Sequence, residues 1–373
     1  MSAKDVKLGE IVDIVMGQAP PGEACNKDGI GTVFVKAGEF QERQPLVREW
    51  TTKPLKFSEP GDVLVCVVGA TAGKINESVF RCAIGRSVAA VRADATRLAP
   101  SFLFHFLKTK VMQLRDGSQG AAQGVITREM VQSLSLKLPT LNNQYRIAAI
   151  LDQADALRAK RREALAQLDS LTQSIFIEMF GDPVANLKNW PKKTLKELGR
   201  VKTGGTPPSS KEGMFDGLVP FVTPGDLGHN QPAKRTVTEL GASEAETVRA
   251  GAALVCCIGA TIGKMAKASE FCAFNQQINA VEWSAAIDDD FGIHALGFFK
   301  THIATQGAST TLPILKKSSF EKISIPIPPF TMQKVFADRI GAIANLKENL
   351  RSSLSEMDDL FSSLQHRAFS GAL

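Results

Sequence analysis

An internal duplication constrains the fold of this chain more than any other feature of its sequence. Residues 64–74, LVCVVGATAGK, match residues 254–264, LVCCIGATIGK, at eight of eleven positions. FVKAGEF (34–40) corresponds in the same order to FVTPGDL (221–227). A shared order with a nearly constant offset predicts two homologous halves of about 188 residues, and not a solenoid of short repeats.

Each duplicated segment ends in GATxGK, a glycine-rich pattern that has to be compared with a phosphate-binding loop. A P-loop reads Gly, four residues, then Gly-Lys-Ser/Thr. Here Val68 and Ile258 stand in place of the first glycine, and Ile75 and Met265 in place of the hydroxyl residue. The pattern instead predicts a tight turn that leaves a buried strand, with glycines at positive φ.

Two lysines, Lys74 and Lys264, end these turns. One interpretation is a turn that is purely structural. The other is a contact to DNA phosphate by the lysine and the turn amides, because backbone N–H groups are common phosphate ligands. The sequence leaves both open.

Both halves follow the same internal plan. Short apolar runs bounded by Gly and Pro, such as residues 62–68, are typical of strands. Short helical patches follow at residues 101–114 and 291–303. Each half then ends in a long Pro-free segment, about 142–180 and 331–369, which predicts a long helix.

Apolar residues in these two segments recur at alternating spacings of three and four, which predicts a coiled coil. Arg158 and Lys347 interrupt the two seams at equivalent positions, and Arg161 interrupts the first again. A lone helix with such a seam is poorly stable, so we expect the two to pair antiparallel. The residues predicted to pair the helices are Ile147, Leu151, Leu165, Leu168, Ile175, Phe336, Ile340, Ile343, Leu350, Leu354, Met357, Phe361 and Leu364.

The predicted fold class is therefore α/β (α+β), with two globular domains separated by an antiparallel pair of long helices and related by a pseudo-two-fold repeat. The predicted domains are residues 1–140, a central helix 141–183, residues 184–329 and a distal helix 330–373.

Composition limits the possible partners, the cell compartment and the kinds of site. The net charge of +6 and pI near 8.9 permit a polyanionic partner without demanding one. The N-terminal residues lack an apolar signal core and no run reaches the length of a membrane span, so we expect a cytoplasmic protein. The six cysteines form no C-x-x-C pair, and the five histidines show no metal or triad spacing. The paired His105 and His294 are expected to be packed core residues.

The doubled order of motifs resembles the specificity (S) subunit of type I restriction–modification systems. The resemblance rests on the repeated GATxGK, on a P-P/T-x-x-x-Q entry into each long helix (Pro139 to Gln144, Pro328 to Gln333), and on LTQSIFIEMFGDP at residues 171–183. It implies that each target recognition domain reads one half of a bipartite double-stranded DNA site. It also implies that the helices set the gap and dock two modification subunits, with restriction (translocase and nuclease) subunits as further partners.

The resemblance also implies that this chain is not an enzyme, because the modification subunit brings S-adenosylmethionine and the adenine-methylating site. IPPF (327–330) is similar to an adenine-gripping Asn-Pro-Pro-Phe motif, but Ile327 replaces the asparagine, so we interpret it as a hinge. No cofactor or metal is expected. A self-contained DNA methyltransferase and a coiled-coil scaffold that binds only proteins are the alternatives.

Candidate DNA contacts are polar residues expected on loops, since Arg and Lys favour guanine and Asn and Gln favour adenine. AFNQQINA (273–280) and AIGRSVAA (83–90) differ where their flanks agree, as two copies reading different bases would, although an exposed polar turn explains them equally. The basic run 158–163 is either a solvated helix face or a contact to DNA or a partner. The candidates are Arg43, Lys74, Arg86, Gln123, Ser209, Ser210, Lys211, Lys264, Asn275, Gln276, Gln277, Lys316 and Lys317.

Overall fold

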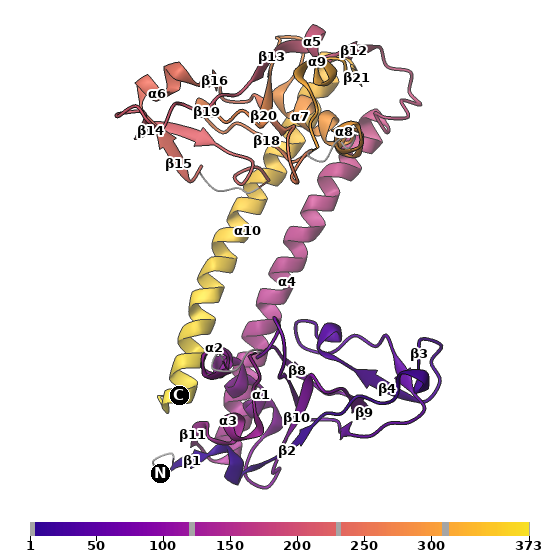
Figure 1. The fold of residues 1–373 in the computed structure, drawn as a ribbon, viewed down its shortest axis with the longest axis vertical. Coiled ribbons are helices and arrows are strands. Elements are labelled where there is room, and N and C mark those ends of the chain that lie inside the picture. Colours follow the sequence, from indigo (N-terminus) through magenta and orange to yellow (C-terminus); the bar gives the residue numbers. More distant parts are fainter. Residues whose placement is uncertain (1–3, 119–123, 229–232, 308–312, 373) are drawn as a thin grey trace. The chain divides into compact units, whose positions relative to one another are not determined.

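The chain folds into two compact units that repeat one plan. A computed structural model describes residues 4–118, 124–228, 233–307 and 313–372. Unit 1 comprises Met1–Arg162 and Ser352–Leu373, and unit 2 comprises Glu163–Arg351. Each unit mixes strands and helices, and the two longest helices contribute residues to both units (Figure 1).

Unit 1 is built from small sheets covered by short helices. Its strands are β1 (Lys4–Lys7), β2 (Val12–Met16), β3 (Cys25–Asn26), β4 (Thr32–Val35), β5 (Trp50–Thr51), β6 (Phe57–Ser58), β7 (Val63–Cys66), β8 (Ile75–Glu77), β9 (Cys82–Ile84), β10 (Val88–Ala93) and β11 (Ser135–Leu138). Its short helices are η1 (Leu8–Glu10), η2 (Gly22–Ala24), η3 (Ala37–Glu39), α1 (Pro100–Thr109), α2 (Val111–Ser118) and α3 (Arg128–Gln132). The strand orders are β1-β11, β2-β10-β7-β8 and β3-β5-β4-β9-β6.

Unit 2 repeats much of this plan: it adds helix α6, and its described residues form no helices that correspond to η2 and η3. Its strands are β12 (Lys192–Thr194), β13 (Gly199–Thr203), β14 (Phe215–Val222), β15 (Arg235–Val237), β16 (Glu246–Val248), β17 (Ala253–Cys256), β18 (Met265–Lys267), β19 (Cys272–Phe274), β20 (Ile278–Trp283) and β21 (Ser324–Pro326). Its short helices are α5 (Leu195–Leu198), α6 (Glu239–Glu244), α7 (Asp289–Gly297), α8 (Lys300–Gly307) and α9 (Lys317–Phe320). The strand orders are β12-β21, β13-β20-β17-β18 and β15-β14-β19-β16.

These strand orders show that the sequence repeat is a repeat of structure. The order β2-β10-β7-β8 in unit 1 recurs as β13-β20-β17-β18 in unit 2. One parallel pairing recurs as well, with Phe34 opposite Ala83 between β4 and β9, and Phe221 opposite Ala273 between β14 and β19. Two tandem α/β domains with two long helices are thus confirmed, whereas the domain boundaries remain predictions.

The apolar run in each duplicated segment is continuous because both faces of its strand are covered. In β7, Val63 and Val65 pack into the core that also holds helix α1, whereas Leu64 and Cys66 pack into a second core with β4 and β9. Strand β17 divides its side chains between two cores in the same way. The duplicated segment therefore forms the central layer of each unit.

The long helices are α4 (Leu141–Phe180) and α10 (Phe330–Ser370), close to the predicted bounds. In unit 2, Asp169 pairs with Lys347, and Phe176 packs against Phe336 further along α4 and earlier along α10. In unit 1, Arg158 pairs with Asp358. The contacts in unit 2 run in opposite directions along the two helices, so the helices pair antiparallel there (Figure 1).

Ion pairs across the helices explain how Arg158 and Lys347 are accommodated where they interrupt the two seams. Arg158 is only 15% exposed and bonds to Asp358 and Asp155, with its guanidinium 4.2 Å from the centroid of the Phe361 ring. Lys347 is equally buried and lies 2.8 Å from Asp169. A mostly buried cation in an apolar seam is costly unless it is paired, and the repeat supplies an aspartate in both places.

The seam itself departs from the predicted spacing at one end. Ile147, Leu151 and Phe361 are buried as expected in unit 1. At the end of α4, however, Phe176 and Phe180 are buried, and the predicted Ile175 is only partly so. The rings of Phe176 and Phe180 contact Phe291 of α7 as well as α10, so a third element rotates the buried face by one residue.

The cysteines are buried apart from Cys25, which is half-buried, and all are free thiols. Burial raises the pKa of the Cys257 and Cys272 thiols to about 12, so both are protonated and unreactive at neutral pH. Within the described ranges, no cluster of three or more His, Cys, Asp or Glu side chains could hold a metal ion. None of the helices described there is long and apolar enough to cross a membrane.

Replacing Phe176 with alanine should destabilise the chain by about 3–5 kcal/mol, because the ring is 1% exposed and lies within 4.9–5.6 Å of four other aromatic rings. Ile177→Ala is the matched control: its side chain is 43% exposed and should cost less than about 1 kcal/mol. Denaturant unfolding of the full chain measures both. Equal losses for the two variants would contradict the packing described here.

Candidate nucleic-acid interface

The GATxGK motif forms a closed turn between β7 and β8. Gly69 and Gly73 have φ of 89° and 85°, which other residues rarely adopt. The Gly73 amide donates to the Cys66 carbonyl at 2.7 Å, and the Lys74 amide donates to the Thr71 carbonyl at 3.0 Å. The Thr71 hydroxyl also lies 3.3 Å from Cys66 Sγ. The two glycines, the threonine and the lysine amide of the motif thus each have a structural part in the turn.

The second copy repeats the glycine conformations and the internal hydrogen bonds of this turn. Gly259 and Gly263 have φ of 92° and 85°, and Thr261 Oγ1 lies 3.4 Å from Cys256 Sγ. The amides of Gly263 and Lys264 again donate to carbonyls within the turn. The amides of these two residues, like those of Gly73 and Lys74, are therefore not available to a phosphate.

The two lysines are placed differently. Lys74 Nζ donates to the Phe40 carbonyl at 2.7 Å, so its ammonium ties the turn to the end of β4 and η3. Lys264 has no hydrogen bond or ion pair from its ammonium to any described residue. It lines a cavity of about 330 Å³ together with Gly228 and Lys300. Lys264 is thus the better placed of the two to meet an anion.

A second turn lies beside the GATIGK turn in unit 2. It joins β19 to β20 and contains Asn275, the exposed Gln276, and Gln277. The Cys257 amide donates to the Gln277 carbonyl at 2.8 Å, and Thr206 Oγ1 donates to Gln276 Oε1. This predicted base-reading turn is therefore held between the strand that leads into the GATIGK turn and the loop at 204–208.

Unit 1 has the same arrangement with different side chains. The turn between β9 and β10 carries the exposed Arg86 at the position of Gln276. The Gln18 amide donates to the Ile84 carbonyl at 3.0 Å, and the Val67 amide donates to the Ser87 carbonyl at 2.9 Å. One backbone frame therefore presents an arginine in unit 1 and glutamines in unit 2.

A third segment in unit 2 joins this group. Ile314 forms a bridge with Ile258, and the Leu315 amide donates to the Cys257 carbonyl at 2.8 Å. The exposed Lys316 follows at the start of α9, and Lys317 pairs loosely with Glu321 at 3.8 Å. We name as the unit-2 polar cluster the predicted residues that these three neighbouring segments bring together: Lys264, Asn275, Gln276, Gln277 and Lys316.

Other predicted contacts lie outside this group. Ser209 and Ser210 are exposed on the loop after the Pro-Pro pair, and Lys211 pairs with Glu244 at 2.9 Å. Gln123 lies outside the described residues.

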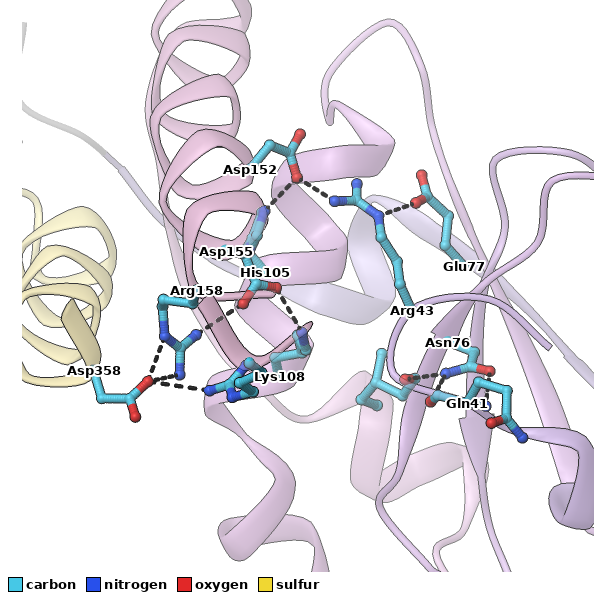
Figure 2. A network of polar contacts seen from close by, with 12 residues as sticks. Gln41, Arg43, Asn76, Glu77, His105, Lys108, Asp152, Asp155, Arg158 and Asp358 are labelled. Carbon is cyan, nitrogen blue, oxygen red and sulfur yellow. Dashed lines mark hydrogen bonds and ion pairs between the residues drawn. The ribbon is translucent and has the colours of Figure 1, made fainter. Parts of the chain in front are cut away.

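Arg43 is engaged inside unit 1. Its guanidinium bonds to Glu77 and Asp152, each at 2.8 Å, and lies 5.1 Å from the centroid of the Phe104 ring (Figure 2). Asp152 of α4 also accepts a bond from His105 Nε2 at 2.9 Å. Arg43 therefore links the recognition part of unit 1 to its long helix, and base reading by this residue would require these bonds to break.

The paired histidines are packed, as predicted. His105 is fully buried, and burial lowers its pKa against the opposing effect of Asp152. Burial also lowers the pKa of His294, whose Nδ1 lies 2.8 Å from the Asp290 carbonyl. Both imidazoles are therefore neutral at pH 7 and are held by internal contacts.

Sequence reasoning missed the aspartates that pair with the seam cations. Asp169 and Asp358 are separated by the same 189 residues as Arg158 and Lys347, so comparison of the two repeats could have found them. It also missed the contact of Thr206, whose partner Gln276 lies 70 residues away in the sequence.

The features described so far, two repeated modules that each continue into a long helix, are those of one protein family, and the chain belongs to it. The family described as type I restriction modification DNA specificity domain matches residues 2–167 and again residues 187–356. The two matches correspond to the two halves of the internal repeat.

Curated relatives carry the same family name. Over 173 residues the chain is 31% identical to a type I restriction enzyme MjaX specificity subunit of Methanocaldococcus jannaschii. This alignment covers 46% of this chain and 40% of that protein. It is 30% identical over 127 residues to the type I restriction enzyme EcoBI specificity subunit of Escherichia coli. That alignment covers 32% of this chain and 27% of the relative. The matched stretches thus span less than half the length of these relatives.

Solved structures resemble the whole chain. The S subunit of a type I restriction–modification system from M. genitalium has a TM-score of 0.64 at 17% identity, covering 98% of this chain and 96% of that chain. A chain from a structure of the type I R-M system, solved for its complex assembly and conformational transition, has a TM-score of 0.60 at 20% identity, covering 99% and 98%. At these identities the likeness establishes the fold.

Gly204→Ala should destabilise unit 2 by about 1–3 kcal/mol, because a Cβ there would lie 2.2 Å from the Asn275 carbonyl oxygen and push the β19–β20 turn away. Gly205→Ala is the matched control, since its Cβ would meet nothing closer than 3.7 Å. Denaturant unfolding measures the difference. If both variants are as stable as the parent, the turn is not held as described.

Proposed function

We propose that this chain is the sequence-specific DNA-recognition subunit of a type I restriction–modification complex, and that each unit reads one half of a split DNA site. The observation that carries the proposal is the repeated frame of turns. It holds the backbone constant and varies the exposed side chain, with Arg86 in unit 1 and Gln276 in unit 2. Arginine favours guanine and glutamine favours adenine, so such a frame suits two different half-sites.

In this proposal the chain is not catalytic and needs no cofactor of its own. The segment most similar to a methyltransferase motif, Ile327–Phe330, is engaged in the entry to α10. The Ile327 amide donates to the Pro191 carbonyl at 2.8 Å, and the Pro328 carbonyl accepts a bond from Gln333 at 2.9 Å. Methylation and cleavage then belong to partner subunits, and the setting is the cytoplasm.

We propose that two modification subunits dock on the long helices. Leucines outside the seam stay exposed on both helices: Leu157 and Leu360 in unit 1, and Leu171 and Leu346 in unit 2, at 44–57%. Leu157 corresponds to Leu346, and Leu171 to Leu360, by the internal repeat. Two equivalent apolar surfaces fit two copies of one partner.

Lys264→Ala should weaken binding to all duplexes about equally and reduce the salt slope by about 1, because it removes one phosphate contact. Gln276→Ala or Gln277→Ala should instead cost about 1–3 kcal/mol at one base position of one half-site. Duplex binding by the chain with its modification subunit, over a series of salt concentrations, measures both effects. Lys196→Ala removes an exposed charge from α5 and serves as the control. If Lys264→Ala behaves like that control, the phosphate contact is wrong.

A fragment of residues 1–183 should form a homodimer that reads the first half-site twice, as an inverted repeat. Its α4 carries both Arg158 and Asp169, eleven residues apart like Lys347 and Asp358. In an antiparallel pair of two α4 helices, each Arg158 would face the Asp169 of the other copy, while the apolar seams cover one another.

Asp169→Arg should weaken the affinity of this dimer by roughly tenfold, because the substitution removes the ion pair at both symmetric positions. The loss per ion pair is small because the aspartate is 70% exposed in the full chain. Gln167→Arg, on an exposed part of α4, should leave it unchanged. Sedimentation equilibrium measures the association. A fragment that is folded and monomeric at high concentration would contradict the prediction.

A further inference from the structure

Two glutamines at the start of the long helices are completely buried. Gln144 is the fourth residue of α4 and Gln333 the fourth residue of α10, and both side chains are 0% exposed. Burying an amide is costly unless all of its hydrogen-bonding groups are satisfied. Their position and burial therefore require partners that are built into the fold.

Gln144 has three backbone partners. Its Oε1 accepts a bond from the Ala99 amide at 2.8 Å, and its Nε2 donates to the Arg97 and Pro139 carbonyls, each at 2.9 Å. Ala99 is the residue that precedes the first turn of α1, and Pro139 leads into α4. One side chain thus joins the start of α1, the end of the β10 connection and the start of α4.

Gln333 makes the same three contacts in unit 2. Its Oε1 accepts from the Asp288 amide at 3.0 Å, and its Nε2 donates to the Ala286 carbonyl at 3.5 Å and to the Pro328 carbonyl at 2.9 Å. Each of these partners is 189 residues beyond its counterpart in unit 1. All three are backbone atoms, so the contacts persist although Ala99 is replaced by Asp288 and Arg97 by Ala286.

We infer that this glutamine joint, the side chain of Gln144 or Gln333 with its three backbone partners, positions each recognition domain on its long helix. The inference rests on the proposed function, because the direction of the helix relative to the reading turns then decides which gap between half-sites is accepted. The Pro139 and Pro328 bonds hold the entry of the helix. The other two bonds reach across 45 and 47 residues to the recognition domain, so the amide fixes how the helix leaves it.

Gln144→Glu tests the joint with a change of one atom. The carboxylate can still accept from Ala99, but it cannot donate to the Arg97 and Pro139 carbonyls. Burial and those two oxygens would raise the pKa of the new carboxyl above its value in the unfolded chain. The variant should be destabilised at neutral pH and should recover as pH falls through the raised pKa, because the protonated group can donate one bond again.

Gln144→Met keeps the size of the side chain and removes every bond, so it should be destabilised at all pH values. Gln153→Glu, at an exposed position of α4, should show neither effect. Hydrogen exchange of the Ala99 amide gives the direct readout, with exchange about tenfold faster in Gln144→Met than in the parent. The Asp288 amide of unit 2 should be unchanged, and Gln333→Met should reverse this pattern. An unchanged Ala99 amide in Gln144→Met overturns the joint.

Positioning is separated from stability by DNA selection with the modification subunit present, at a temperature where the variant is folded. The joint predicts that Gln144→Met still prefers the first half-site but accepts a wider range of gaps between the half-sites. Loss of the half-site preference with an unchanged gap would mean that the glutamine only stabilises the domain, and would overturn the inference. If the parent complex selects no split duplex at all, the proposed function fails, and the Ala99 amide still decides whether the joint exists.

Discussion

The apolar seam of the long helices is the constraint on which the rest of the structure depends. Helices of 40 and 41 residues with one apolar stripe are each poorly stable alone in water, so α4 and α10 must cover one another. In unit 2 the cover is completed by the rings of Phe176, Phe291 and Phe336. The recognition domain is thus part of the same core as the helices.

Buried polar groups within the apolar core determine how its elements are arranged. Arg158 and Lys347 interrupt the seams, and each is answered by an aspartate on the other helix. Gln144 and Gln333 are answered by backbone atoms of the recognition domain. Apolar contacts alone tolerate sliding and rotation, whereas buried polar groups require particular partners, so these pairs specify one arrangement.

Much of this fold could be predicted from the sequence because the repeat compares the chain with itself. The long helices, the turn at GATxGK and the packed histidines all follow from local patterns. The role of Arg43 could not be predicted, since its partners Glu77 and Asp152 lie 34 and 109 residues away. The burial of Phe176 could not be predicted either, because heptad spacing describes the contact of two helices and not the third element that packs on them. Which polar turns gather into the unit-2 polar cluster depends on strand pairing in the same way.

The central claim is that one recognition frame is used twice with different side chains. Selection of bound sequences from a random pool of duplexes, by the full chain with its modification subunit, tests it most directly. The account predicts two short, unlike motifs separated by a gap of constant length with no base preference. A single continuous motif, or no enrichment over the starting pool, would contradict it.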